Sequence, residues 1–151
     1  MTQSGTRTVF VTGAGSGIGA ATALLLAGGG AHVCCADVDR PAAETTARLA
    51  MERGGRASAH ALDVREEAQW ERVVEHVLET HGRPSVLVNC AGISAASPLA
   101  ETSLAEWRRV LATNLDGAFL ATKYGVRMMR KSGGVIVHNG IDLAVDGGFV
   151  L

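Results

Sequence analysis

The sequence is poor in the residues that mark secreted, membrane-spanning and nucleic-acid-binding proteins. Its three cysteines are odd in number and lack metal-ligand spacing, which argues against a disulfide framework and against a metal site. No apolar run approaches the roughly 20 residues that a membrane-spanning helix needs. The 14 Lys and Arg are scattered among 15 Asp and Glu, so the net charge is −1 and no basic stripe indicates nucleic acid or an anionic membrane.

The cysteines and the first residues also indicate a compartment. Cys34 and Cys35 lie in a predicted buried strand, and we interpret them and Cys90 as small core residues in a reducing cytoplasm. The first predicted strand begins at Thr8, which leaves no room for a signal peptide before it. We therefore expect a cytoplasmic protein that is not bound to a membrane.

Apolar runs alternate with helical patterns at short intervals. The chain has 151 residues, 47% of them hydrophobic, so we expect one domain, 1–151, that buries roughly 70% of its unfolded surface. The alternation predicts an α/β fold in which a parallel sheet carries helices on both faces. The predicted strands are Thr8–Val11, His32–Ala36, Ala57–Leu62, Val86–Asn89 and Gly134–His138. The predicted helices span about 17–28, 41–52, 66–80 and 103–129.

Local signals set the ends of these helices. Gly30 is expected to take the left-handed conformation that closes the first helix, and Asp39 to cap the second. Ser103 and Glu106 are spaced as a capping box at the start of the last helix. Trp70, with valines at helical spacing, is expected to face the sheet.

The most informative segment is a glycine-rich turn between the first strand and the first helix. A dinucleotide pyrophosphate needs this order, because glycines let the backbone approach the phosphates and a helix N-terminus offers unpaired N–H groups and a positive dipole end. The alternative is a glycine-rich loop without a ligand. In this turn we assign to cofactor binding Gly13, Ser16, Gly17, Ile18 and Gly19.

Residues at the ends of later strands extend this site. Asp37 follows the second strand, where its carboxylate can bind a ribose hydroxyl and would repel a 2′-phosphate, so NAD is favoured over NADP. Arg40 nearby keeps NADP as the alternative. The Asp63 carboxylate suits the amino group of an adenine, and Val64 suits its ring face. The alternative for both Asp37 and Asp63 is that each is an ordinary turn residue. Small residues after the fourth strand let the backbone pass close to a ligand or simply form a turn; those assigned are Asn89, Ala91 and Gly92.

Together these residues resemble the short-chain dehydrogenase/reductase family, from about Thr6 to Val137. The matching motifs are Thr12–Gly19, Asp37, Asp63-Val64, Asn89–Gly92 and Asn114 within Thr113–Gly117. The resemblance implies a Rossmann-type sheet of strand order 3-2-1-4-5, NAD(P)-dependent oxidation of alcohols or reduction of carbonyls, and dimers or tetramers. It also implies a catalytic role for Asn114, which would anchor a water beside the family's lysine.

The family's other catalytic residues have no match. The family uses a serine to polarise the substrate oxygen, and a tyrosine with a lysine four residues later to move the proton. The single tyrosine, Tyr124, is followed four residues later by Met128, and no serine occurs after Ser132. We interpret Tyr124 and Lys123 as surface or interface residues of the last helix, and His138 as structural.

An internal deletion is the simplest account of this loss. Residues 135–138 match the end of the family's fifth strand and residues 140–148 match the end of a full-length member, so the second half of the domain is truncated after residue 138. Asn139-Gly140 between apolar runs favours an antiparallel hairpin, or a last strand exchanged with another chain. The sequence leaves open whether the deletion is natural, engineered, or a longer chain written without its middle.

Three functions therefore remain open. The chain is an oxidoreductase that needs the missing segment, a non-enzymatic NAD-binding module, or a structural fragment that pairs with intact relatives. The expected partners are NAD, further copies of the chain, and a small alcohol or carbonyl substrate only if the segment is restored. Nucleic acid and metal are not expected.

Overall fold

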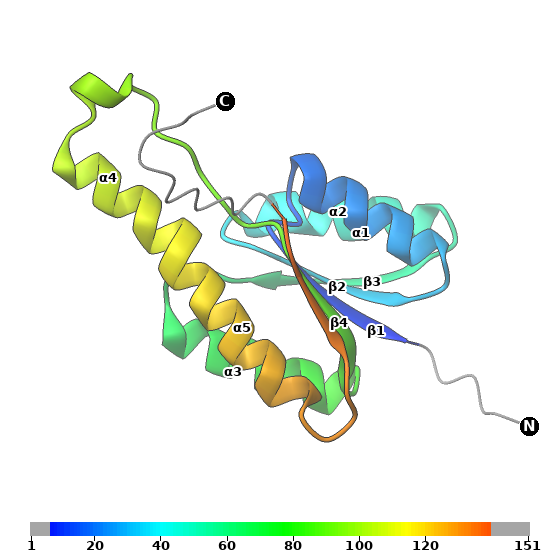
Figure 1. The fold of residues 1–151 in the computed structure, drawn as a ribbon. Helices are drawn as coiled ribbons and strands as arrows, with labels where there is room; N and C mark the ends of the chain where they lie inside the picture. The colour runs from blue at the N-terminus through cyan, green and yellow to red at the C-terminus, as the bar shows by residue number, and fades with distance from the viewer. Residues whose placement is uncertain (1–6, 140–151) are drawn as a thin grey trace, which may run out of the picture.

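The computed structural model describes residues 7–139, in which five strands alternate with helices (Figure 1). All strands pair in parallel in the order β3-β2-β1-β4-β5, which confirms the predicted sheet. The elements are β1 (Thr8–Thr12), α1 (Gly17–Gly28), β2 (His32–Asp37), α2 (Arg40–Glu52), β3 (Arg56–Ala61), α3 (Glu67–Thr80), β4 (Pro84–Asn89), η1 (Leu99–Glu101), α4 (Leu104–Leu111), η2 (Ala112–Asp116), α5 (Gly117–Met129) and β5 (Val135–His138).

Two cores lie on opposite faces of the sheet. Because side chains alternate along a strand, Val9 and Val11 of β1 pack under α1 and α2, whereas Phe10 packs against α3 and α5. The adjacent Cys34 and Cys35 are divided in the same way, one in each core. Both are fully buried, and burial raises the pKa of each thiol to about 12, as suits core residues.

The ends of α1 and α2 form as the sequence predicts. Gly30, directly after the C-cap Gly29, has φ +88°, a conformation that glycine adopts without strain. Asp39 caps α2, because its Oδ1 accepts a hydrogen bond from the N–H of Ala42 at 3.1 Å. Gly30 thus marks the end of α1 and Asp39 the start of α2, on either side of β2.

The long helix predicted over 103–129 is present, but with a π-helical turn, η2, in its middle. Ser103 caps its first turn by accepting the N–H of Glu106 at 3.1 Å. The reciprocal half of the predicted capping box is wrong. The Glu106 carboxylate instead accepts the N–H of Ala96 at 2.7 Å and the Ser97 hydroxyl at 2.6 Å, so it holds the loop after β4.

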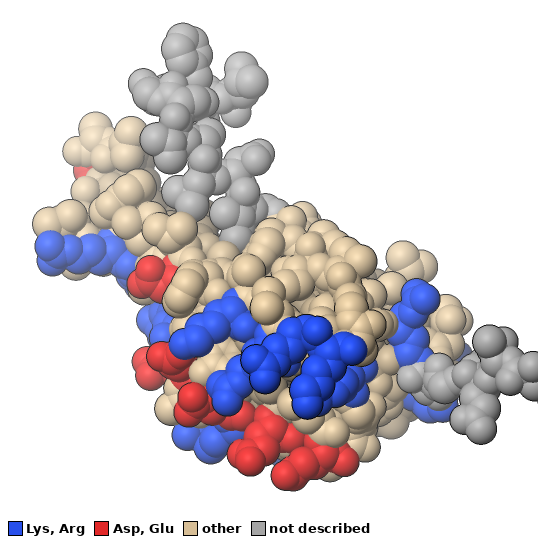
Figure 2. Space-filling view, turned by 60° about the horizontal axis from the view of Figure 1, so that its bottom comes forward, with Lys and Arg blue, Asp and Glu red and all other residues tan. Residues whose placement is uncertain are grey.

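The interface between α3 and α5 is built on stacked aromatic rings. Trp70 lies between Phe10 and Tyr124, with ring centroids 5.9 Å and 5.7 Å away. Tyr124 is fully buried, so placing it on the surface was wrong, because it points from α5 toward α3. Lys123 is half-exposed and pairs with Glu67. Figure 2 brings the lower face of Figure 1 forward and shows basic and acidic side chains side by side.

Four of the five histidines form a cluster between the β3 edge and α3. The rings of His32 and His81 stack at 4.1 Å, and His60 meets His76 and His81 edge-on at 5.7 Å and 6.2 Å. Ser58 Oγ lies 3.1 Å from Nε2 of His32 and 2.9 Å from Nε2 of His60. The charged side chains that face these rings are Arg40 of α2, Arg56 of β3 and Arg72 of α3.

Strand β5 is the least covered part of the described sheet. Its residues Val135 and Val137 are 56% and 44% exposed, while Ile136 packs against the helical face next to Gly125. The predicted hairpin or exchanged strand that would follow β5 lies outside the described residues, as does the proposed junction at Gly140.

Candidate cofactor site

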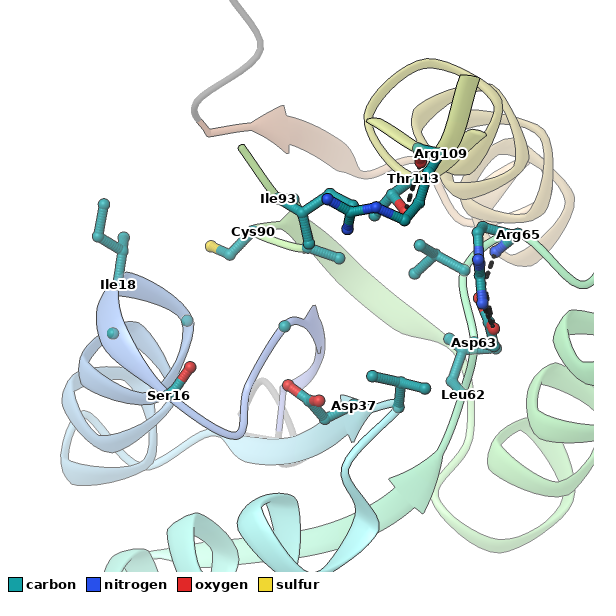
Figure 3. A pocket seen from close by; sticks show the side chains of 17 residues that line it. Ser16, Ile18, Asp37, Leu62, Asp63, Arg65, Cys90, Ile93, Arg109 and Thr113 are labelled. Carbon is teal, nitrogen blue, oxygen red and sulfur yellow. Dashed lines mark hydrogen bonds and ion pairs between the residues drawn. The ribbon is translucent and has the colours of Figure 1, made fainter. Parts of the chain in front are cut away.

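The carboxyl ends of β1 to β4 open into a cavity of about 650 Å³ (Figure 3). Open parallel sheets bind ligands outside the carboxyl ends of their strands, at the point where the strand order reverses, which lies between β1 and β4 in this sheet. Ten of the twelve residues assigned from the sequence line the cavity: Gly13, Ser16, Gly17, Ile18, Gly19, Asp37, Asp63, Val64, Ala91 and Gly92.

The glycines of the turn after β1 are required by close backbone contacts. Gly13 has φ +64°, and a Cβ there would lie 2.8 Å from the backbone nitrogen of Ala91. A Cβ on Gly19 would lie 2.0 Å from the carbonyl oxygen of Gly13. A Cβ on Gly15 would come 2.9 Å from a carboxylate oxygen of Asp37. At Gly13 and Gly19 the turn is therefore packed against backbone, at Gly15 it is packed against the Asp37 side chain, and the space above the turn stays open.

The N-terminus of α1 faces this space without a side-chain cap. Ser16 occupies the N-cap position with extended φ and ψ, yet its hydroxyl makes no capping hydrogen bond. The first turn also carries no acidic residue. The N–H groups of the first turn and the positive end of the helix dipole are thus available to an anion in the cavity.

Asp37 ends β2 and holds the glycine turn. Its Oδ2 accepts the N–H of Gly15 at 2.8 Å, and its Oδ1 accepts the N–H of Asp39 at 2.9 Å. Both bonds fix the carboxylate at the cavity wall, and each oxygen keeps a lone pair for a further donor. The geometry presents a hydrogen-bond acceptor beside the uncapped helix.

Asp63 is paired with an arginine that the sequence analysis did not single out. Nε and Nη2 of Arg65 donate to its two carboxylate oxygens at 2.9 Å and 2.6 Å. Hydrogen bonding from Arg65 lowers the pKa of Asp63 and outweighs the opposing effect of burial. The carboxylate is therefore ionised and held in one orientation at the cavity wall, next to Leu62 and Val64.

Asn89 lies beneath the cavity and does not line it. Its Oδ1 accepts the Thr12 hydroxyl at 2.6 Å, and Thr12 Oγ1 accepts the N–H of Ala91 at 3.3 Å. Its amide nitrogen lies 3.3 Å from Nδ1 of His138, whose Nε2 lies 2.9 Å from the Thr122 hydroxyl. Asn89 and His138 thus join β1, β4, β5 and α5 through side-chain hydrogen bonds.

Asn114 lies in the π-helical turn and fastens it to the loop after β4. Its Oδ1 accepts the N–H of Ile93 at 2.9 Å, and its Nδ2 donates to the carbonyl oxygen of Ile93 at 2.9 Å. Asn114 lines an adjoining cavity of about 280 Å³ together with Ser94 and Asn139. π-Turns inside α-helices occur frequently at functional sites.

The sequence analysis missed several residues of the cavity. Cys90 was interpreted as a core residue, but it is half-buried and lines the cavity. Burial raises the pKa of its thiol, so it stays protonated. The other missed residues follow strand ends or lie on α4 and η2: Val38, Leu62, Arg65, Ile93, Arg109 and Thr113. Position after a strand could have indicated the first four, and the motif around Asn114 could have indicated Thr113, whereas nothing in the helical pattern singled out Arg109.

A comparison with protein families matches residues 7–143 to the short chain dehydrogenase family. The chain belongs to the short-chain dehydrogenase/reductase family. Families of this type use nicotinamide dinucleotides, and the cavity lies where such a fold binds them.

Individual relatives in the short-chain dehydrogenase/reductase family support the same assignment. The D-threitol dehydrogenase of Mycolicibacterium smegmatis is 40% identical over 136 residues, which cover 87% of this chain and 51% of that protein. The (3R)-3-hydroxyacyl-CoA dehydrogenase of Rattus norvegicus is 42% identical over 133 residues, covering 83% of this chain and 51% of that protein. The chain therefore spans about half the length of the curated relatives it matches.

Solved structures of the family agree with the fold. The citronellol catabolism dehydrogenase AtuB of Pseudomonas aeruginosa superposes with a TM-score of 0.82 at 43% identity, over 87% of this chain and 54% of that chain. A 3-ketoacyl-ACP reductase of Sinorhizobium meliloti also gives a TM-score of 0.82, at 35% identity.

Neither a membrane-spanning helix nor a metal site is found in the part of the chain that the structure describes. No helix there has the length and apolar character needed to span a membrane. Across the same residues, no group of three or more His, Cys, Asp or Glu side chains is placed to hold a metal ion.

Proposed function

We propose that this domain binds NAD(H), with the pyrophosphate at the turn Gly13–Gly19 and the adenosine toward Asp37 and Asp63. One observation carries the proposal. The uncapped N-terminus of α1 and the fixed Asp37 carboxylate share one cavity of about 650 Å³. The helix end suits a phosphate anion, and the carboxylate suits a ribose hydroxyl.

The residues present fit such a cofactor, and what they do is limited to binding and orientation. A bound nicotinamide supplies hydride transfer. The first-turn N–H groups of α1 bind phosphate, Asp37 orients the ribose, and Val64 and Leu62 give an apolar wall for the base. Buried thiols such as Cys34 suit the reducing cytoplasm in which we expect the protein to act.

Calorimetric titration with NAD, together with competition by ADP-ribose, tests the proposal. We expect saturable binding of both ligands and displacement of one by the other. Competition is the decisive part, because ADP-ribose lacks the nicotinamide and depends only on the half of the site that the described residues form. Absence of heat together with absence of competition would exclude the proposed function.

Asp37 should set the preference for NAD over NADP. In an Asp37→Ser variant the acceptor for the ribose hydroxyls is shortened and the negative charge is lost, so we expect about tenfold weaker NAD binding and stronger NADP binding. Titration of both cofactors measures the ratio. The matched control is Asp39→Ser, which removes a nearby charge but leaves a residue that can still cap α2. An unchanged NAD/NADP ratio in Asp37→Ser would contradict this prediction.

We infer further that the chain as written lacks the catalytic serine, tyrosine and lysine through an internal deletion. The supporting observation is that Tyr124 is buried against Trp70 and, like Lys123, does not line the cavity. The alternative functions remain an NAD-binding module and a structural fragment. Intact mass tests the deletion, since a value well above 15.6 kDa would show that the protein contains the missing segment. Nucleotide binding separates the NAD-binding module from the structural fragment.

The chain alone should show no dehydrogenase turnover. A positioned acid or base contributes roughly 10²–10⁴-fold to rate, and residues that act as one unit fail together when key members are absent. We expect absorbance at the NADH wavelength to stay at background with NAD and simple alcohols. Clear reduction of NAD by material of verified mass would refute the expectation.

We propose also that α5 mediates association with a second copy of the chain. Leu115 of η2 and Phe119 and Val126 of α5 follow one another at helical spacing and are 42%, 64% and 54% exposed. In a two-fold dimer the same surface of both copies meets, so this stripe can pack against its own copy. A Phe119→Glu variant should therefore shift a dimer toward monomer in sedimentation analysis, whereas Thr45→Glu on the distant α2 should not. A monomeric wild-type chain would overturn this proposal.

A further inference from the structure

Arg109 projects from α4 over the cofactor cavity, far in sequence from the glycine turn. Figure 3 shows its side chain on the wall opposite Asp37, between Ile93 and Arg65. Two arginines therefore line the cavity among the described residues, and they differ in what already binds them.

The Arg65 guanidinium is committed, because it donates from Nε and Nη2 to both carboxylate oxygens of Asp63. Arg109 is not committed in this way. Its closest acidic partner is Glu106, 4.0 Å from Nη2, and the Glu106 oxygens already accept shorter bonds from the loop after β4. The Arg109 side chain is 48% exposed, so its planar face and its donors remain available to a ligand.

The position of Arg109 determines which part of the dinucleotide its side chain can contact. Asp37 holds the adenosine ribose in the proposed function, and the wall beyond it is formed by Leu62 and Val64. A base that extends from that ribose along this apolar wall presents its other face toward α4. Guanidinium groups stack favourably on such aromatic faces.

We propose that Arg109 is a cofactor-binding residue that covers the adenine ring of the bound dinucleotide. The inference rests on the proposed function and goes beyond it, because it adds a binding residue from α4 to a site otherwise built from strand ends and the N-terminus of α1. Arg109 and the apolar wall enclose the base between them, and the phosphates stay at the N-terminus of α1.

The test compares two variants and two ligands. Arg109→Ala removes the guanidinium, and Arg108→Ala is the matched control, because it makes the same change one position earlier on the same helix and outside the cavity. Adenosine, which has no phosphate, and ADP-ribose are titrated against each variant by ligand-observed NMR. Thermal denaturation verifies that both variants remain folded, as expected for exposed residues.

We expect Arg109→Ala to weaken the binding of adenosine and of ADP-ribose by the same factor, about three- to tenfold. Arg108→Ala should change the binding of neither ligand. Weaker binding of ADP-ribose with unchanged binding of adenosine would indicate that Arg109 contacts a phosphate, and would overturn the assignment to adenine. Unchanged binding of both ligands would overturn the inference altogether. If the wild-type chain binds neither ligand, the proposed function itself fails, which is a distinct result.

Discussion

A Gly19→Ala variant should bind ADP-ribose about 100-fold more weakly than the wild-type chain. The new Cβ would lie 2.0 Å from the carbonyl oxygen of Gly13 and 2.6 Å from its carbonyl carbon. Both are backbone atoms that follow the central strand β1, so the clash cannot be relieved by rotating a side chain. The turn must open, which separates the first-turn N–H groups of α1 from Asp37. Calorimetric titration measures the loss.

Gly28→Ala provides the matched control for this substitution. Gly28 lies at the other end of α1, and a Cβ there would meet nothing within 4 Å. Replacing it should leave ADP-ribose binding unchanged and stabilise the fold slightly, by about 0.4–1 kcal/mol, because alanine loses less conformational freedom in a helix. Equal binding by Gly19→Ala and Gly28→Ala would show that the glycine turn does not form the phosphate site.

Acidification should destabilise the domain through the histidine cluster. Burial, and to a smaller extent the neighbouring histidines and Arg40, lower the pKa of His60 to about 4. Burial and nearby positive charges also lower the pKa of His32 and His81. Since the unfolded chain has histidine pKa values near 6.5, folding stability is fully present above that pH and is lost as the pH falls toward 4.

The expected loss of folding stability is large for a single domain. A shift from 6.5 to about 4 in His60 alone corresponds to about 3 kcal/mol, out of the 5–15 kcal/mol typical of a folded domain. Urea unfolding at pH 7.5, 6, 5 and 4.5 measures it. His60→Gln can keep the bond to Ser58 without titrating, so its stability should depend less on pH. His138→Gln, outside the cluster, should keep the wild-type dependence; a flat wild-type profile above pH 4.5 would contradict the prediction.

Most of the fold could be predicted because hydrophobic periodicity reports which face of an element is buried. The strands and the helix limits at Gly30 and Asp39 follow from the period and from turn chemistry, whereas the strand order follows from the resemblance to the family. The π-helical turn around Asn114 could not be predicted, since it is a single short interruption of five residues and its sequence carries no signal that distinguishes it from an α-helical turn. The burial of Tyr124 could not be predicted either, because it depends on packing against the partner helix α3.

The candidate site also contains residues that could be predicted from the sequence and residues that could not. Residues directly after strand ends, such as Asp37 and Asp63, were predictable because parallel strands deliver their carboxyl ends to one edge. Arg109 and the Asp63–Arg65 pair were not, because both depend on side-chain directions that sequence spacing does not fix. Asn89 matched the family motif, but its side chain faces inward, to Thr12 and His138.

The central position of β1 has a consequence for synthesis of the chain. β1 is made first, and β2 and β3 can pair beside it as soon as residues 32–61 have followed. Its other edge stays open until β4, some 75 residues later, supplies its partners. During that interval the apolar strand from Val9 to Val11 offers an unpaired edge of the kind that promotes aggregation of nascent chains. The cavity at the carboxyl ends of β1 to β4 therefore takes shape only after β4 has been made, although its glycine turn follows β1 directly.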